Sequence, residues 1–159
     1  MTQHRALTAL AIALAASSCG DDHDPDEHSD PSALACETIE ETAPSLTATT
    51  ERADAPTLAV GAHARVTLPA GEASFVRLES SGELLLFADV ANVVTALFAG
   101  DDPSNRLPAG SPNPDCPAAI ADHFDLDLSG AGPWYLRLGP AAVPEIWLRL
   151  VSAEGHGAH

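Results

Sequence analysis

The chain has no lysine, and seven arginines stand against 23 aspartates and glutamates in its 159 residues. The formal net charge is −16. Nucleic-acid binding requires clustered basic side chains that neutralise phosphates, so this composition excludes it as the expected function. Electrostatic docking on anionic lipid is disfavoured for the same reason. The charged partners that suit this chain are cations.

Long hydrophobic runs are also missing. The apolar stretch near the start covers residues 6–16 and contains one polar residue, Thr8. It is too short to span a bilayer as a helix, which takes about 20 residues. A basic start at Arg5, a short apolar run and small residues after it together predict a secretory signal peptide over residues 1–18.

The residues Ala16, Ser17, Ser18 and Cys19 resemble the lipobox of bacterial lipoproteins. The resemblance implies that Cys19 becomes an acylated N-terminus and anchors the protein at a membrane of the cell envelope. Two or more acyl chains are sufficient for stable anchoring. Ala16 departs from the family pattern, in which leucine is commonest, and ordinary cleavage to a secreted protein is the alternative.

Residues 19–35 are poor in apolar side chains and rich in Asp, Glu, Pro and Ser. Such a composition buries too little apolar surface to offset the entropy of ordering, so we expect an acidic tether. Its simplest role is to hold a domain of residues 36–152 away from the membrane. Residues 153–159 are expected to form a short tail that carries His156 and His159.

Most of the domain alternates between apolar and polar residues with a period of two, which indicates β-strands. Turn residues such as Pro69–Gly71 and Ser81–Gly82 separate the segments. Residues 83–90 and 92–100 are apolar on both faces, as in strands buried on both sides. Strands are expected within residues 62–69, 74–80, 83–90, 92–100, 119–130, 134–140 and 144–152.

The connections are too short for helical crossovers, so we predict an all-β fold, a single antiparallel β-sandwich or jelly roll. Residues 100–117 hold several prolines and should form one long surface loop. Residues 36–58 suggest either a helical turn near Ile39 or a short strand at 45–50. The expected core consists of Val66, Leu68, Val76, Leu78, Leu84, Leu86, Leu97, Phe124, Leu126, Leu128, Leu136, Leu138, Leu148 and Leu150.

There are few cysteines, three in all. If Cys19 carries lipid, Cys36 and Cys116 remain as a pair in an oxidising compartment, which predicts a disulfide between them. Two free thiols or two thiolate metal ligands are the alternatives.

The order of strand motifs looks like the bacterial pre-peptidase C-terminal type of β-sandwich, with residues 132–138 matching its late motif loosely. In layout the chain also resembles small predicted lipoproteins that join a His/Asp-rich tether, one such sandwich and a His-containing tail. The matching positions are Ala55–Pro56, His63, Cys116, His123, Tyr135 and Gly139–Pro140. The resemblance implies at most a role that involves metal.

Histidine is the abundant reactive residue, with seven in the chain. Neutral imidazole is a common ligand for zinc and copper, and nearby carboxylates can complete a site. His63 and His123 both point away from the core by alternation and would form a body site with Asp125 or Asp127 if their strands were neighbours. His23, His28, His156 and His159 would be auxiliary ligands. Unrelated surface histidines are the plain alternative.

The chain lacks the usual motifs of metalloproteases, serine hydrolases, redox dithiols and phosphate-binding loops, so we expect no enzyme activity. Trp134, Tyr135 and Trp147 are expected to pack within the sheets, although exposed aromatics would be able to stack on sugars. The sequence therefore predicts an envelope lipoprotein that binds zinc or copper for buffering or delivery. The alternative is a non-catalytic adhesion, interaction or structural lipoprotein at the same location.

Overall fold

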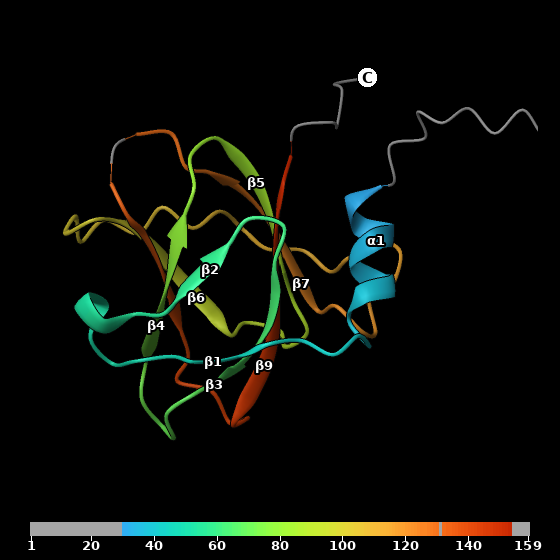
Figure 1. The fold of residues 1–159 in the computed structure, drawn as a ribbon, viewed down its shortest axis with the longest axis horizontal. Coiled ribbons are helices and arrows are strands. Elements are labelled where there is room, and N and C mark those ends of the chain that lie inside the picture. The colour runs from blue at the N-terminus through green and yellow to red at the C-terminus, as the bar shows by residue number, and fades with distance from the viewer. Residues whose placement is uncertain (1–29, 131, 154–159) are drawn as a thin grey trace, which may run out of the picture.

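The structure, a computed structural model, describes residues 30–130 and 132–153. It is an all-β sandwich with one short helix, as predicted (Figure 1). A five-stranded sheet has the order β1-β3-β9-β5-β7, and a four-stranded sheet has the order β2-β4-β8-β6. The elements are α1 (Pro31–Thr38), β1 (Ser45–Thr47), η1 (Arg52–Asp54), β2 (Thr57–Ala59), β3 (His63–Thr67), β4 (Ser74–Glu79), β5 (Glu83–Ala88), β6 (Val94–Ala99), β7 (Asp122–Asp127), β8 (Trp134–Leu138) and β9 (Glu145–Ser152).

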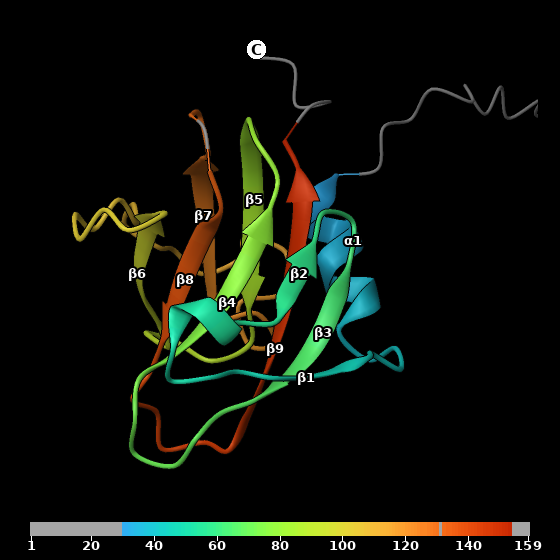
Figure 2. The ribbon, with the colours of Figure 1, turned by 60° about the vertical axis from the view of Figure 1, so that its left-hand side comes forward.

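Successive strands alternate strictly between the two sheets. Every odd-numbered strand belongs to the five-stranded sheet, and every even-numbered strand belongs to the four-stranded sheet. Figure 2 shows the two layers. The predicted turns at Pro69–Gly71 and Ser81–Gly82 therefore carry the chain from one sheet to the other and do not close hairpins within a sheet.

The sandwich is antiparallel as predicted, except at one edge of each sheet. β1 pairs with β3 in parallel, and β2 pairs with β4 in parallel, while the remaining pairs are antiparallel. Parallel strands need a crossover between them. Here the intervening strand in the opposite sheet supplies that crossover, without an α-helix.

The main core lies between the sheets and contains the predicted residues. All fourteen side chains that the alternation assigned to the core are buried, the most exposed being Leu68 at 7 %. Val66, Leu86 and Leu136, for example, are fully buried. Trp134 lies in the same core at 2 % exposure, so the expectation that this aromatic packs within the sheets is confirmed.

A second apolar cluster covers the outer face of the five-stranded sheet. Its buried members are Ala35 from α1, Ile120 from the loop before β7, and Leu85, Phe87 and Trp147 from the sheet. Figure 2 shows α1 lying against this sheet beside β3 and β9. β5 is consequently buried on both faces, as its continuous apolar sequence predicts, and Trp147 is fully buried on the side that alternation assigns to solvent.

The Cys36–Cys116 disulfide is confirmed. The two Cα atoms are 5.9 Å apart, and the bond joins α1 to the loop that carries Ile120. The buried Asn113 side chain donates a hydrogen bond from Nδ2 to the carbonyl of Ser32 at 3.2 Å, which holds the same loop against α1. The long loop predicted over residues 100–117 is therefore partly buried and fixed.

The folded body begins earlier than predicted, because α1 starts at Pro31, inside the stretch assigned to the tether. Asp30 is its N-cap, and its carboxylate accepts a hydrogen bond from the Ser32 amide at 2.9 Å. Proline suits the first turn of a helix, where its missing N–H has no partner to lose. The boundary at Cys36 is corrected to Pro31. In the stretch that the sequence left open, α1 continues past Cys36 to Thr38, and β1 forms at Ser45–Thr47.

Replacing Cys36 and Cys116 with alanine should lower the free energy of unfolding. The disulfide closes a loop with a sequence separation of 80 residues. Losing a crosslink of that length costs about 4 to 5 kcal/mol, because the unfolded chain regains entropy. Urea unfolding at neutral pH, in a Cys19→Ser background, measures the change. A loss below about 1 kcal/mol would show that α1 and the loop before β7 are held against the five-stranded sheet by packing alone.

Candidate functional site

The two histidines of the predicted body site lie on the same face of the same sheet, but two strands stand between them. His63 on β3 is opposite Arg149 on β9. Arg149 is opposite Phe87 on β5, and Phe87 is opposite His123 on β7. Adjacent strands are about 4.8 Å apart, so the two histidine backbones are about 14 Å apart. The hypothesis of a shared His63–His123 site is wrong, because it needed neighbouring strands.

His123 is engaged with Ser111 at the edge of the sheet. The backbones of the two residues form a bridge, with N···O distances of 3.1 and 2.6 Å. The imidazole Nδ1 lies 3.1 Å from both the hydroxyl and the carbonyl oxygen of Ser111. The ring also stacks on Phe87, with 6.1 Å between centroids. These contacts occupy Nδ1 and leave Nε2 as the nitrogen that can accept a metal ion.

The His63 ring lies beside the ring of Trp147, a member of the second apolar cluster. The two ring centroids are 6.3 Å apart. Nε2 of His63 and Nε1 of Trp147 are shielded from solvent and have no hydrogen-bond partner among the described residues. A nitrogen in this position is poorly placed to bind a metal ion that arrives from solvent.

Arg149 is a buried cation, and it replaces the metal ligand that the sequence led us to expect beside His63. It is 7 % exposed. Its Nη1 donates to the Leu34 carbonyl at 3.1 Å and to the Thr38 hydroxyl, both in α1. Burial lowers the pKa of the guanidinium from its ordinary value, and the negative charge of Glu41 acts in the opposite direction. A cation beside the last turn of a helix also complements the helix dipole.

Arg65 and Asp89 form a second polar contact on this face. Nη1 of Arg65 lies 3.3 Å from Oδ2 of Asp89, and the other oxygen of Asp89 accepts the Trp147 amide at 2.8 Å. Burial raises the pKa of Asp89 from its ordinary value, although the Trp147 hydrogen bond and the Arg65 charge act to lower it. Both charges thus help to fix β3, β5 and β9 and are not free for a ligand.

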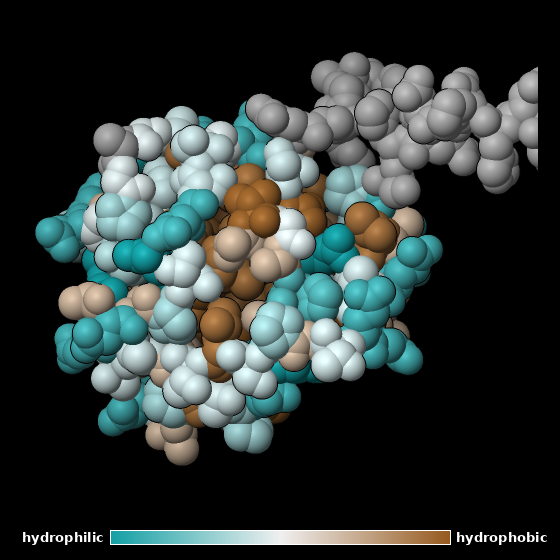
Figure 3. Space-filling model, in the orientation of Figure 1, coloured by the Kyte–Doolittle hydropathy of each residue, from teal (hydrophilic) through white to brown (hydrophobic). Residues whose placement is uncertain are grey.

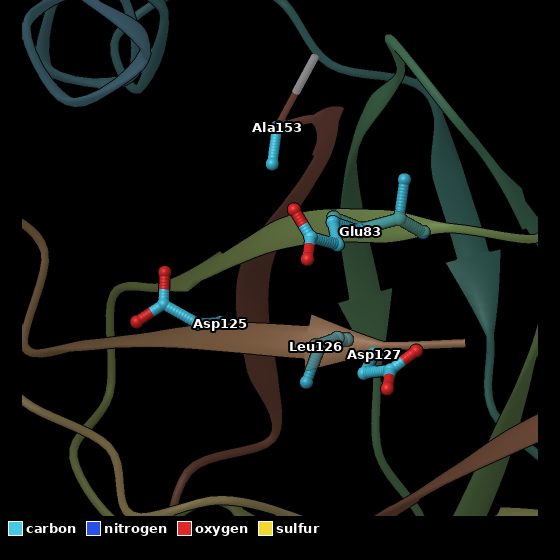
Figure 4. A pocket seen from close by; sticks show the side chains of 6 residues that line it. Glu83, Asp125, Leu126, Asp127 and Ala153 are labelled. Atoms are coloured by element: carbon cyan, nitrogen blue, oxygen red, sulfur yellow. The ribbon is translucent and has the colours of Figure 1, made fainter. Parts of the chain in front are cut away.

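Carboxylates gather at the end of the sheet where β9 finishes. Glu83 on β5 is opposite Asp127 on β7, and Asp125 follows on the same face. With Ala153 they line a shallow hollow of about 310 Å³. Figure 4 shows that the carboxylates of Asp125 and Asp127 point apart and do not converge on one point. Within residues 30–130 and 132–153, no group of three His, Cys, Asp or Glu side chains is placed to hold a metal ion.

The remaining predicted site residues lie outside the described residues. These are the lipidation residue Cys19 and the auxiliary ligands His23, His28, His156 and His159. The described ends nevertheless lie together: α1 begins and β9 ends at the same end of the sandwich in both ribbon views (Figures 1 and 2). Ala153 packs against the cluster that contains Ala35 of α1, and its amide donates to the Glu83 carbonyl at 3.0 Å.

A concentration of arginines on the outer face of the four-stranded sheet was not singled out from the sequence. Alternation does place Phe75 and Arg77, and separately Tyr135 and Arg137, on single sides of their strands. Only the register brings them together, since Arg137 is opposite Phe75 and Tyr135 is opposite Arg77. We call this surface the arginine face. Its members are Arg52, Phe75, Arg77, Phe98, Tyr135 and Arg137.

The surface seen in Figure 3 is mixed, with hydrophobic side chains in the middle and hydrophilic ones around them. Among the described residues, Val60 is the large hydrophobic side chain that stands out as exposed, at 38 %. No helix of the described chain is long and apolar enough to cross a membrane. The surface in this view therefore presents charged side chains and small apolar patches more than a broad apolar area for docking.

Comparisons with known proteins find no match, either to a protein-family model or to a curated protein. The resemblance to His-tailed lipoproteins with a pre-peptidase C-terminal-like sandwich is therefore still a prediction.

Replacing Arg149 with methionine should destabilise the fold, because α1 loses its contact with β9 through Leu34 and Thr38. We expect the free energy of unfolding to fall by about 1 to 3 kcal/mol, the usual cost of breaking a buried hydrogen bond from a charged group. The exposed Arg137→Met variant is the matched control and should change stability by less than about 0.5 kcal/mol. Chemical denaturation measures both, and equal effects would contradict the role assigned to Arg149.

Proposed function

We propose that the protein is an exported lipoprotein of the cell envelope, anchored through Cys19, that binds a divalent transition metal, zinc or copper, at one end of its sandwich. The ligands are His23 and His28 before the body and His156 and His159 after it. The protein binds the metal for buffering or delivery and catalyses no reaction on it.

One observation carries this proposal: the two described ends of the chain leave the body at the same end of the sandwich (Figures 1 and 2). His28 precedes Asp30 by two residues, and His156 follows Ala153 by three. A chain reaches at most about 3.5 Å per residue, so each imidazole stays within about 10 Å of its exit point, plus the side chain itself. Histidines from opposite ends of the sequence can therefore meet on one ion.

The charge at this end favours a cation. Glu83 and Asp127 lie beside Ala153, and Asp24, Asp26 and Glu27 accompany the N-terminal histidines in sequence. Imidazole with carboxylate suits zinc and copper. Because two chain ends must be ordered when the ion binds, part of the binding energy is lost, and we expect a dissociation constant of about 1 µM or weaker.

The proposal gives His63 and His123 no joint role. The two histidines lie on strands that are not neighbours, and Arg149 and Phe87 lie between them. They serve as controls for the terminal histidines, since they are the same residue type and are located on the folded body.

Calorimetric titration of the chain of residues 19–159 with Zn²⁺ and Cu²⁺ tests the proposal, with Cys19→Ser replacing the lipidated residue. Changing His23, His28, His156 and His159 to alanine should weaken the affinity at least tenfold, because the principal ligands are removed. The control, His63→Gln with His123→Gln, should stay within twofold. Absence of heat from the parent chain, or a larger effect of the control, would contradict the proposal.

A second candidate function is a non-catalytic interaction module at the same location. The observation that favours it is the arginine face, which gathers three of the few cations of a strongly acidic protein on one exposed surface.

A further inference from the structure

The arginine face brings three arginines close to one aromatic residue, Phe75. Arg52 lies over the Phe75 ring at 5.3 Å from its centroid and over the Phe98 ring at 4.0 Å. Arg137 is directly opposite Phe75 on the neighbouring strand, and Arg77 is the next residue along β4 on the same side. Arg77 and Arg137 therefore lie on one small area of the four-stranded sheet, and Arg52 of η1 lies over the Phe75 ring beside them.

Two of these guanidinium groups are held in place before any ligand arrives. Nη1 of Arg52 donates to the Gly100 carbonyl at 3.2 Å, in addition to its stacking on two rings. Arg77 donates from Nε to the Thr57 hydroxyl at 3.1 Å and pairs with Glu79. Fixed guanidinium groups lose little entropy when they bind a carboxylate, and their planar fork suits that partner.

The third group, Arg137, is exposed and has no hydrogen-bond or ion-pair partner among the described residues. It lies between Phe75 on β4 and Ala96 on β6, neither of which can neutralise it. Across the outward positions of β4 and β8 the cations Arg77 and Arg137 face one carboxylate, Glu79. These positions on β4 and β8 thus carry an excess of positive charge on a chain whose net charge is −16, while Glu51 and Asp54 flank Arg52.

The spacing of these charges matches an extended peptide with alternating carboxylates. Residues two apart on a strand are separated by about 7 Å, and diagonal neighbours on adjacent antiparallel strands by about 7 to 8 Å. Arg77 and Arg137 stand in that diagonal relation. The chain contains one segment with the corresponding pattern, Asp22, Asp24 and Asp26, which contributes no Lys or Arg of its own.

We propose that the arginine face binds the acidic segment of residues 21–27 from a neighbouring copy of this chain. The carboxylates of Asp22, Asp24 and Asp26 pair with the guanidinium groups of Arg52, Arg77 and Arg137. The interaction joins molecules head to tail. Because the segment also contains His23, this interaction competes with metal binding by that histidine.

We assign the bound segment to a neighbouring copy because, within one molecule, residues 21–27 join the body on the opposite side of the sandwich from the arginine face. The segment joins the body at Asp30, where α1 covers the outer face of the five-stranded sheet. The arginine face is across the whole sandwich, and two packed sheets and a helix together are at least about 20 Å thick. Asp26 is only four residues from Asp30, so it reaches about 14 Å at most.

Binding of a fluorescently labelled peptide of residues 20–30 tests the proposal, with the chain of residues 19–159 carrying Cys19→Ser and with EDTA present to exclude metal. Binding should weaken as NaCl is raised from 50 to 500 mM. Arg137→Gln should weaken it at least fivefold, and Arg106→Gln, an exposed arginine outside the face, should change it less than twofold. A peptide of the same composition with its carboxylates consecutive should bind at least threefold more weakly.

Sedimentation of the same chain provides the second arm. The weight-average mass should rise with concentration, and both Arg137→Gln and the triple change of Asp22, Asp24 and Asp26 to asparagine should return it to that of the monomer. Equal effects of Arg137→Gln and Arg106→Gln, or equal binding of the two peptides, would overturn the proposal. A monomer at all concentrations that binds polygalacturonate in an Arg137-dependent manner would also overturn it, since the face would then serve an acidic glycan.

Discussion

The structure depends on the burial of both faces of the five-stranded sheet. One face forms the main core against the other sheet, and α1 with the loop before β7 closes the second. The Cys36–Cys116 bond fastens this cover at the point where helix and loop meet. A small domain buries a limited fraction of its surface, so a second cluster and a crosslink are substantial additions to its stability. The positions of the histidines, of Arg149 and of the chain ends all follow from this cover.

Much of this arrangement could be predicted from the sequence, because the period-two pattern of a strand directly reflects which side chains face a core. The positions of β3 to β9, the fourteen core residues and the disulfide follow from pattern and from cysteine count, whereas β2 was not predicted. Trp147 shows where the pattern stops being informative. Alternation puts the Trp147 side chain on the other side of β9 from the core residue Leu148, which is the outer side of the sheet. Whether that outer side is exposed to water depends on α1, which lies about 110 residues earlier in the sequence.

Strand register and strand order are also not determined by the local sequence of any one strand. His63 and His123 alternate outward as expected, but their separation depends on β9 and β5 being placed between them. The turn residues at Gly71 and Gly82 mark where the chain reverses and do not distinguish a hairpin from a connection between sheets. The start of α1 does have a local signal, because Asp30 followed by Pro31 is the pattern of a helix N-terminus.

Carboxylates line the end of the five-stranded sheet near Ala153, and Arg77 and Arg137 lie on the outer face of the four-stranded sheet. We propose that metal binds at the chain ends and that the covered face of the five-stranded sheet is structural. The most direct test is NMR of the imidazole nitrogens during titration with Zn²⁺. The account predicts that the signals of His23, His28, His156 and His159 shift at the first equivalents while those of His63 and His123 stay in place. Early shifts of His63 and His123, with the terminal histidines unchanged, would contradict it.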